Sequence, residues 1–341
     1  MVLVHNSSDD PKTQAVVLAL FSGAVDRAIG PGCLDCPPII AVGNPQKEDA
    51  PIYTQGKRDP FIAAGRQGLH RVIQKIAQKV NNPNVPLQPN EIAEEIYQCW
   101  KIGASVAHVH VWDEEGNDSM KVETFKKVID TLHGNHPDCN IILNLTAAGG
   151  IANSEEARMA PFKTLKPEMA SFDCGTMNWM HMGIFNNNPL FLEKMGLAMQ
   201  EAGVKPEIEV FDLGMIYDAG YYLKKGILKA PLHFQFCMGC AGGVDATIED
   251  LVTMRSTLAK VAPGSTWSAF GVGKGAMEIM YSAIAAGGHI RVGMEDNVMY
   301  RKGELAESNM QLIARARRVI EEYGYEVATS DEARQILGLT K

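Results

Sequence analysis

Two histidines separated by one residue are the groups whose type and spacing first indicate chemistry in this sequence. His108 and His110 lie in the Val-rich segment 105–112, whose alternating pattern is typical of a buried strand. Side chains two positions apart on a strand point to the same side, so both imidazoles are expected near the carboxyl end of that strand. Such a pair can supply two ligands to a catalytic metal. The simpler alternative is two core histidines that bond backbone groups.

The second candidate segment is 287–297, in which two adjacent acids, Glu295 and Asp296, end a predicted strand. Beside a divalent ion, one carboxylate can bind the metal while its neighbour acts as a base. Arg291 lies four residues before Glu295 and could hold a substrate carboxylate through a bidentate contact. The alternative is that the two acids begin a solvated helix, with Asp296 as its cap.

The elements that must position these groups alternate between short apolar runs and amphipathic stretches. Strands are predicted at 37–44, 105–112, 140–147, 169–175, 206–212, 232–239, 266–272 and 289–295. Helices are predicted at 90–102, 121–134, 155–164, 189–203, 215–225, 247–261, 275–286 and 304–323. This alternation predicts an α/β fold, a (β/α)8 TIM barrel, in which the last strand lies beside the first and second, so that His108, His110 and Glu295 converge. An open doubly wound sheet is the main alternative, although no GxGxxG motif follows the first strand.

The amino-terminal part of the chain exceeds what a minimal barrel needs. Residues 1–36 are predicted to form an extension with a helix at 12–29, and residues 37–341 a single catalytic domain. Within that domain, 45–89 form a long insertion after the first strand, with a helical pattern at 65–80. A long loop at this place often serves as an active-site lid, and the alternative is a surface or oligomer contact.

The composition of the chain indicates which binding partners and which cellular compartment to expect. The 341 residues carry a net charge of -8 and no lysine or arginine run, so neither nucleic acid nor an anionic membrane is an expected partner. No apolar run is long enough to span a membrane and no basic signal-peptide region is present, so a cytoplasmic enzyme is expected. The CxxC pairs Cys33/Cys36 and Cys237/Cys240 are expected to be buried thiols rather than a structural zinc site.

Longer segments, in order between residues 85 and 336, carry a more specific signal. They are Gly103–His110 with Asp113–Gly116, Leu165–Ser171, Pro231–Phe236, Gly287–Asn297 and Gly303–Asn309, the last of which is expected to open the eighth helix. These segments resemble the β-keto acid cleavage enzyme family, whose best-known type is the 3-keto-5-aminohexanoate cleavage enzyme. The resemblance implies a TIM barrel with a divalent metal, usually zinc. It also implies condensation of a β-keto acid with acetyl-CoA to give acetoacetate and a new CoA thioester.

The resemblance also implies roles for the residues already singled out. The family's metal ligands fall on His108, His110 and Glu295, its general base on Asp296, and its substrate-carboxylate arginine on Arg291. These residue types suit the reaction, because a divalent cation stabilises the oxyanions and enolates of β-keto acid cleavage while a carboxylate takes a proton.

Other polar residues of the expected site follow the family with small changes. Thr146 stands where the family has a serine, and Ser171 where it has a threonine, so both hydroxyl groups are kept. Glu209 keeps a carboxylate on the fifth strand, which could set the orientation and the pKa of Asp296.

Three positions depart from the family pattern and concern recognition of the substrates. Asp173 replaces an asparagine, Glu48 is the candidate for an acid that reads an ammonium group, and Lys274 keeps a positive charge for the CoA. These changes leave the identity of the β-keto acid open.

Other functions for the same pattern differ in the ligands or substrates they would need. A metal-dependent hydrolase of the same fold would add ligands at later strand ends, whereas His233 lies within a predicted strand and His289 begins one. A class II aldolase-like lyase would act on aldehydes without acetyl-CoA. A non-catalytic binding protein would not need Asp296, Arg291 and Thr146 beside the metal ligands. A homo-oligomer, for example a tetramer, is expected.

Overall fold

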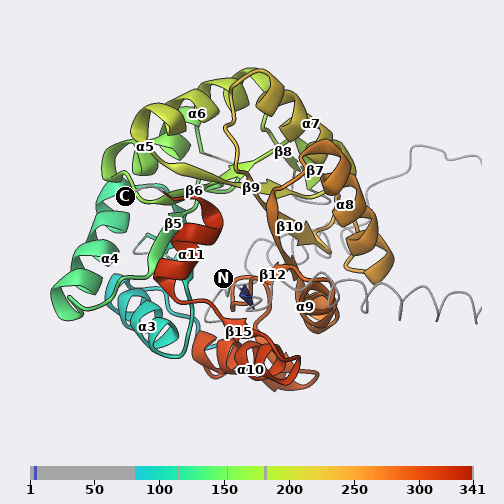
Figure 1. The fold of residues 1–341 in the computed structure, drawn as a ribbon. Helices are drawn as coiled ribbons and strands as arrows, with labels where there is room; N and C mark the ends of the chain where they lie inside the picture. Colours follow the sequence, from blue (N-terminus) through green and yellow to red (C-terminus); the bar gives the residue numbers. More distant parts are fainter. Residues whose placement is uncertain (1–3, 6–80, 114–115, 152, 180–182, 340–341) are drawn as a thin grey trace, which may run out of the picture. The chain divides into compact units, whose positions relative to one another are not determined.

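A curled parallel sheet of seven strands organises the part of the chain that the computed structural model describes, which is residues 4–5, 81–113, 116–151, 153–179 and 183–339. In spatial order the strands are β12 (His289–Ile290), β11 (Thr266–Gly271), β10 (His233–Met238), β9 (Lys205–Val210), β6 (Met169–Asp173), β5 (Ile142–Leu145) and β2 (Val106–Val109). Helices surround the outside of this sheet (Figure 1). The α/β class and seven of the eight predicted strands are therefore confirmed.

The amino-terminal predictions fall outside the described residues. They are the extension 1–36 apart from Val4 and His5, the helices at 12–29 and 65–80, the strand 37–44, the insertion 45–89 as far as residue 80, Glu48, and the pair Cys33/Cys36. Closure of the sheet into an eight-stranded barrel depends on the strand 37–44 and stays a prediction.

Five of the helices between the strands begin at a residue whose side chain caps the first turn. Side-chain oxygens of Ser154, Asn188, Asp212, Thr247 and Ser308 each accept a first-turn backbone N–H, as expected for residues at this position. The helices are α3 (Pro89–Lys101), α4 (Val122–Asn135), α5 (Glu155–Leu165), α6 (Pro189–Ala202), α7 (Leu213–Lys224), α8 (Ile248–Val261), α9 (Ala276–Ala285) and α10 (Asn309–Glu322). Their amphipathic stretches were predicted to within a few residues, except at the start of α10.

A further helix, α11 (Ser330–Leu337), covers the amino ends of three strands. Ala333 and Leu337 pack in one buried cluster with Val106, Ile142 and Met169, the first residues of β2, β5 and β6. The carboxyl ends of the strands remain for polar side chains, and this is the end at which barrel enzymes carry their active sites.

Two predicted elements need correction near the carboxyl end of the sheet. The predicted strand 289–295 is only the two-residue β12, because the chain turns at 294–296, where the Gly293 carbonyl accepts the backbone N–H of Asp296 at 3.2 Å. The predicted helix 304–323 starts at residue 309, because residues 299–305 form a hairpin of β13 (Met299–Arg301) and β14 (Glu304–Leu305). The segment Gly303–Asn309 therefore leads into α10 rather than forming its first turn.

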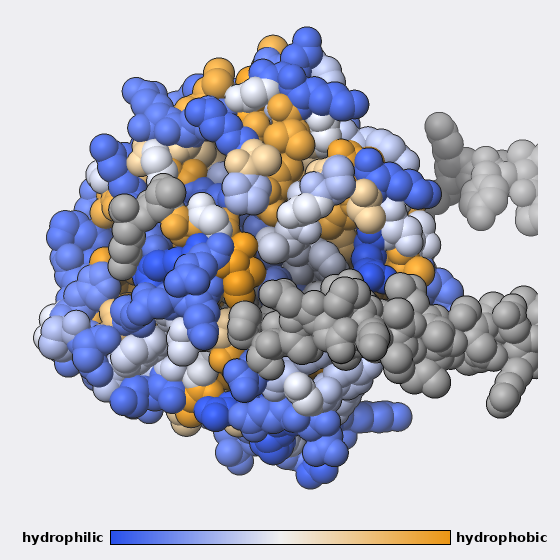
Figure 2. All heavy atoms as spheres, viewed as in Figure 1, coloured by the Kyte–Doolittle hydropathy of each residue, from blue (hydrophilic) through white to orange (hydrophobic). Residues whose placement is uncertain are grey.

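Short antiparallel pairs, which the sequence patterns did not predict, complete the described part. They are β1 (Val4–His5) with β15 (Glu326–Val327), β3 (Val111–Trp112) with β4 (Asp118–Ser119), and β7 (Met177–Trp179) with β8 (Gly183–Phe185). Hydrophilic side chains cover most of the rim of the face shown in Figure 2. No helix among the described residues combines the length and the apolar content needed to cross a membrane.

Candidate active site

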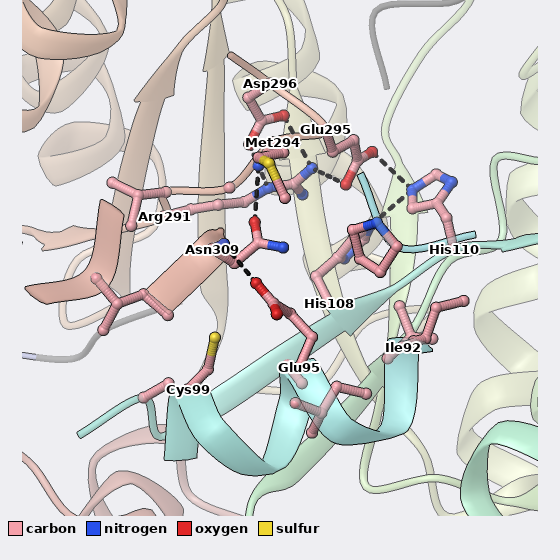
Figure 3. A pocket seen from close by; sticks show the side chains of 18 of the residues that line it. Ile92, Glu95, Cys99, His108, His110, Arg291, Met294, Glu295, Asp296 and Asn309 are labelled. Carbon is pink, nitrogen blue, oxygen red and sulfur yellow. Dashed lines mark hydrogen bonds and ion pairs between the residues drawn. The ribbon is translucent and has the colours of Figure 1, made fainter. Parts of the chain in front are cut away.

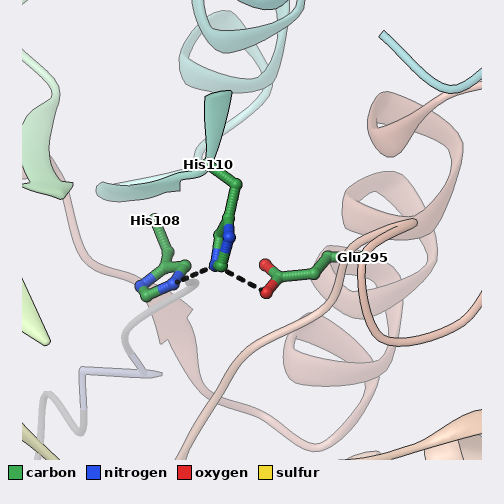
Figure 4. Close-up of side chains that lie close together, drawn as sticks. All are labelled: His108, His110 and Glu295. Carbon is green, nitrogen blue, oxygen red and sulfur yellow. Dashed lines mark hydrogen bonds and ion pairs between the residues drawn. The ribbon is translucent and has the colours of Figure 1, made fainter. Parts of the chain in front are cut away.

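His108, His110 and Glu295 meet at the carboxyl end of the sheet. His108 Nε2 lies 3.1 Å from His110 Nε2, and His110 Nε2 lies 2.7 Å from Glu295 Oε1 (Figure 4). The three ligand atoms all fall within 4.8 Å of one another. The histidines come from β2 and the residue that follows it, and Glu295 comes from the turn after β12. The two edge strands of the sheet thus bring their polar ends together, as a curled sheet requires.

Arg291 connects this cluster to two further acids. Its Nε and Nη2 each lie 3.1 Å from an oxygen of Asp296, its Nη1 lies 3.1 Å from Glu209 Oε1, and its Nη2 lies 2.9 Å from Glu295 Oε2. Figure 3 shows Glu295 between Arg291 and His110. Residues four apart on an extended strand would be separated by about 13 Å, so the turn at 294–296, rather than the predicted strand, brings Glu295 back to Arg291.

The protonation states of these acids follow from burial and from Arg291. Burial raises the pKa of Asp296 to about 6, with Glu295 adding to the rise and Arg291 opposing it. Burial and the neighbouring Asp173 raise the pKa of Glu209 well above its usual value, again against Arg291. Glu209 bonds Arg291, so it acts on Asp296 through the guanidinium. Asp296 is buried and no helix follows it, which rules out the alternative of a solvated helix cap.

Of the predicted hydroxyl groups, that of Thr146 directly follows β5, and that of Ser171 lies in the middle of β6. Thr146 Oγ1 accepts the backbone N–H of Ala148 at 3.1 Å, and Ser171 Oγ accepts that of Ala147 at 2.9 Å. Both side chains are buried, and each keeps its own O–H to donate.

Asp173 stands across from Glu209 in the pairing of β6 with β9. It is 1% exposed, and Arg158 Nη2 lies 3.5 Å from its Oδ2. Its other oxygen, Oδ1, has no hydrogen-bond partner among the described residues. A buried carboxylate oxygen without a donor is costly, which makes this atom a candidate contact for a polar ligand.

Lys274 lies on an exposed turn beside the site. The turn is the short helix η1 (Gly273–Gly275), and the backbone N–H of Gly273 donates to the Asp296 carbonyl at 3.0 Å. Lys274 thus follows directly on a residue that is bonded to the Asp296 backbone, and its own side chain is exposed.

A pocket that is partly open to solvent adjoins the cluster of His108, His110 and Glu295. One wall holds the histidine pair, Arg291, Glu295 and Asp296, and the opposite wall is formed by α3 and α10, whose side chains there are mostly apolar but include Glu95 and Asn309. The pocket lies between β2 and the segment after β12, the two edges of the described sheet. The predicted strand 37–44 would occupy the gap between these edges in a closed barrel, so the polar wall is the part of the pocket that belongs to the candidate site.

Residues 73–339 match the sequence profile of a family described as "beta-keto acid cleavage enzyme". The chain belongs to this family. It is therefore an enzyme that cleaves β-keto acids, and the resemblance noted in its sequence is confirmed.

Related members of the β-keto acid cleavage enzyme family match most of the chain. A 3-keto-5-aminohexanoate cleavage enzyme from Fusobacterium nucleatum is 42% identical over 263 residues, which cover 77% of this chain and 94% of that protein. The enzyme of the same name from Acetoanaerobium sticklandii is 40% identical with the same coverage. A 3-dehydrocarnitine:acetyl-CoA trimethylamine transferase from Rhizobium meliloti is 34% identical over 307 residues, 83% of this chain and 98% of that protein.

Among solved structures, the complex of ObcA with oxaloacetate shares the fold of this family member. The superposition has a TM-score of 0.69 at 19% sequence identity and covers 76% of this chain and 68% of that one. At this identity the likeness concerns the fold alone.

Several candidate metal ligands in this β-keto acid cleavage enzyme lie away from the cluster. His233 Nδ1 lies 2.9 Å from Thr266 Oγ1 and its Nε2 lies 3.2 Å from Ser268 Oγ, deeper in the sheet. Among the described residues, His233 is therefore held away from the cluster and does not supply the extra ligand of the hydrolase alternative. Of the predicted buried thiols, Cys237 is buried and Cys240 is half-buried, and burial raises the pKa of the Cys240 thiol to about 12.

Two polar residues of this family member were not predicted from the sequence. Glu207 Oε2 lies 3.2 Å from His108 Nδ1, and Asn144 Nδ2 donates to the same carboxylate oxygen at 2.5 Å. Burial opposes ionisation of Glu207, but the hydrogen bond with His108 outweighs it and lowers the pKa of the carboxyl to about 2. The alternation rule that places Glu209 inside also places Glu207 there, two residues earlier, and this signal could have found it.

Proposed function

We propose that this protein condenses a β-keto acid with acetyl-CoA to give acetoacetate and the CoA thioester of the remaining acyl group. The observation that carries the proposal is the contact of one guanidinium, Arg291, with both the metal-ligand carboxylate Glu295 and a second acid, Asp296. The relatives support the co-substrate, since the name of the Rhizobium meliloti protein includes acetyl-CoA.

Zinc is the metal we propose, with His108, His110 and Glu295 as ligands. Two imidazoles and one carboxylate suit this ion and leave coordination positions open for substrate. Ligand atoms around a tetrahedral zinc are about 3.3 Å apart, and the two Nε2 atoms are separated by 3.1 Å. A bound divalent cation would act as a Lewis acid toward the keto and carboxylate oxygens of the substrate.

Asp296 is the proposed general base. Arg291 holds both of its oxygens and is itself held by Glu209, so the carboxylate is oriented before substrate arrives. Asp296 takes a proton from the carbon between the two carbonyl groups of the β-keto acid, and this carbon then bonds to the acetyl carbonyl as the CoA thiolate leaves. The thiolate attacks the original keto carbon, the carbon–carbon bond beside it breaks, and Asp296 returns its proton to the departing acetoacetate.

The remaining polar residues are proposed to bind the substrates. Thr146 and Ser171 can donate their hydroxyl hydrogens to substrate oxygens, and Lys274 can attract the phosphates of CoA. Asp173 is proposed to pair with a cationic substituent of the β-keto acid. Two observations support this pairing. Asp173 Oδ1 has no hydrogen-bond partner among the described residues. Around His108, His110 and Glu295, carboxylates also outnumber guanidinium groups. The names of the Fusobacterium and Acetoanaerobium relatives include an amino-substituted keto acid.

The test is formation of acetoacetate by the zinc-loaded protein with acetyl-CoA and a panel of cationic, neutral and anionic β-keto acids. We expect acetoacetate only when acetyl-CoA is present, and the highest kcat/KM with a cationic member. D296N is expected to lower kcat by about 100-fold or more, because a general base contributes that much. The matched control D130N changes an exposed acid on α4 and should keep wild-type activity. Acetoacetate from no panel member, or product formed without acetyl-CoA, would contradict the proposal.

Two coarser features of the enzyme complete the proposal. We propose that the strand 37–44 closes the curled sheet into an eight-stranded barrel, and that the protein assembles into a homo-oligomer. The exposed apolar side chains Leu190 and Leu197 on α6 and Tyr217 and Tyr221 on α7 support an outer contact surface.

A further inference from the structure

We infer that Glu207 is a positioning residue that fixes the tautomer and the orientation of the metal ligand His108. The inference rests on the metal site of the proposed function. Glu207 lies on β9, is fully buried, and places Oε2 3.2 Å from His108 Nδ1, the ring nitrogen opposite to the one in the ligand cluster. A ligand histidine commonly donates its second N–H to such a carboxylate.

The protons around Glu207 can be assigned from donor and acceptor chemistry. Asn144 Nδ2 lies 2.5 Å from Glu207 Oε2 and 3.2 Å from His108 Nδ1. An ionised carboxylate only accepts, so both the Asn144 amide and the His108 Nδ1–H must donate to the one oxygen. A neutral imidazole with its hydrogen on Nδ1 carries a lone pair on Nε2, which is the atom that faces His110 and Glu295. The contact with Glu207 therefore selects the tautomer that can bind a metal.

The residues next to Glu207 have other hydrogen-bond partners, so its carboxylate interacts mainly with His108. Glu209, two residues along β9, bonds Arg291, and His233, across from Glu207 in the sheet, bonds Thr266 and Ser268. The ion pair of Glu207 within the described part of the chain is with His108. A buried carboxylate destabilises a fold unless it is well paired, so a purely structural role would be better filled by an apolar side chain.

Metal affinity tests the inference directly, because it is read without any turnover. We would measure the Kd for Zn²⁺ of the wild-type protein, E207Q and E207A by competition with a chromogenic chelator, and the visible spectrum of each protein with Co²⁺. E207Q keeps a hydrogen-bond acceptor but loses the charge, and E207A loses both. We expect Kd to rise by about 10-fold in E207Q and by about 100-fold in E207A, with a changed Co²⁺ spectrum in E207A.

The matched control is S268A, which removes buried hydrogen bonds to His233 and Gln235 in the same sheet interior without touching His108. It should lower the melting temperature and leave the Zn²⁺ Kd unchanged. If E207Q and E207A lower the melting temperature of the metal-free protein but bind Zn²⁺ like the wild type, Glu207 is only structural and the inference is overturned. Failure of the wild type to bind Zn²⁺ or Co²⁺ would overturn it together with the metal site. Normal metal effects without any acetoacetate would instead contradict the proposed function alone.

Discussion

At the scale of single residues, the guanidinium of Arg291 is the central contact of the site. It is 6% exposed, forms a two-bond fork with Asp296, and stacks with its carbon centre 4.5 Å from the Phe270 ring centroid. A lysine carries the same charge but presents it as a point, with neither the planar fork nor the flat face that stacks on an aromatic ring. The geometry of the proposed base Asp296 and of the proposed ligand Glu295 thus depends on the shape of Arg291 as much as on its charge.

This dependence gives a prediction for R291K. Loss of the fork should leave Asp296 poorly oriented, and we expect kcat to fall by about 100-fold, since orientation of a reacting group contributes several kcal/mol. The control is R334K, which breaks a similar fork between Arg334 and Glu168, formed by two contacts of 2.7 Å where α11 packs. Steady-state kinetics and thermal melts should show lower stability in both variants but lower kcat in R291K alone. Wild-type kcat in R291K would show that charge is sufficient.

The sequence predicted that His108, His110 and Glu295 lie together, and it missed the residues that support them. His108 and His110 were predictable because a strand has a period of two, and Glu295 because neighbouring strand ends meet. The role of Asn144 was not predictable, because its partners Glu207 and His108 are far away along the chain and depend on the pairing of β5 with β2. Single-sequence patterns report periodicity, while hydrogen-bond partners depend on which strands are neighbours.

At the scale of elements, the two-residue strand β12 carries Arg291 into the site with little pairing of its own. Its pairing with β11 consists of two register pairs, Ser268 with His289 and Ala269 with Ile290. The residue before it, Gly288, packs directly against Trp267, and a Cβ there would lie 2.3–2.5 Å from ring atoms of the indole. Close contact with a bulky ring thus fixes where the short strand begins.

G288A should therefore disturb both stability and catalysis. The indole of Trp267 is stacked on Phe236 with ring centroids 5.3 Å apart and cannot move freely, so we expect the free energy of unfolding to fall by about 2–3 kcal/mol. A displaced β12 should also lower kcat. The control is G134A near the end of α4, where nothing lies within 4 Å and alanine should be neutral or stabilising. Urea unfolding and kinetics on both variants give the measurement, and an unchanged G288A would show that Trp267 gives way.

Regular elements could be predicted from the sequence and irregular ones could not. Seven strands and the helices between them follow from apolar periodicity and from caps such as Ser154 and Thr247. The predicted strand 289–295 was too long because its residues favour strand, while the turn that ends β12 comes from backbone hydrogen bonds to Gly293. The hairpin of β7 and β8 escaped prediction because segments of three residues carry too little periodicity.

At the scale of the whole molecule, the interior of the sheet is unusually polar and includes two buried histidines below the site. Burial lowers the pKa of His233 to about 4 and that of His289 to about 3. Both are therefore neutral in the folded protein at a pH where an unfolded chain, with a histidine pKa near 6.5, already binds protons. Acid thus favours the unfolded state, and stability is lost as the pH falls from about 6.5 toward the folded-state values.

This linkage predicts the pH profile of H233Q. The variant keeps hydrogen-bonding capacity but cannot titrate, so it should lose less stability in acid than the wild type. Between pH 6 and 5, the difference in free energy of unfolding between the two proteins should change by about 1.4 kcal/mol per pH unit. Urea unfolding at pH 7, 6 and 5 measures this, and H133Q, which changes an exposed histidine on α4, should follow the wild-type profile. Parallel profiles for H233Q and the wild type would contradict the assignment.

The placement of the three proposed ligands on opposite edges of the sheet has a kinetic consequence. His108 and His110 lie at the end of the edge strand β2, and Glu295 lies after the other edge strand, β12. The other strands of the sheet come between these two strands in the sequence. A metal held by all three would close a long loop, which is costly to form in an unfolded chain and slow to reopen once formed. Dissociation of the ion would then require the two edge strands to separate. The dissociation rate of the bound metal would therefore measure how often these edges separate transiently.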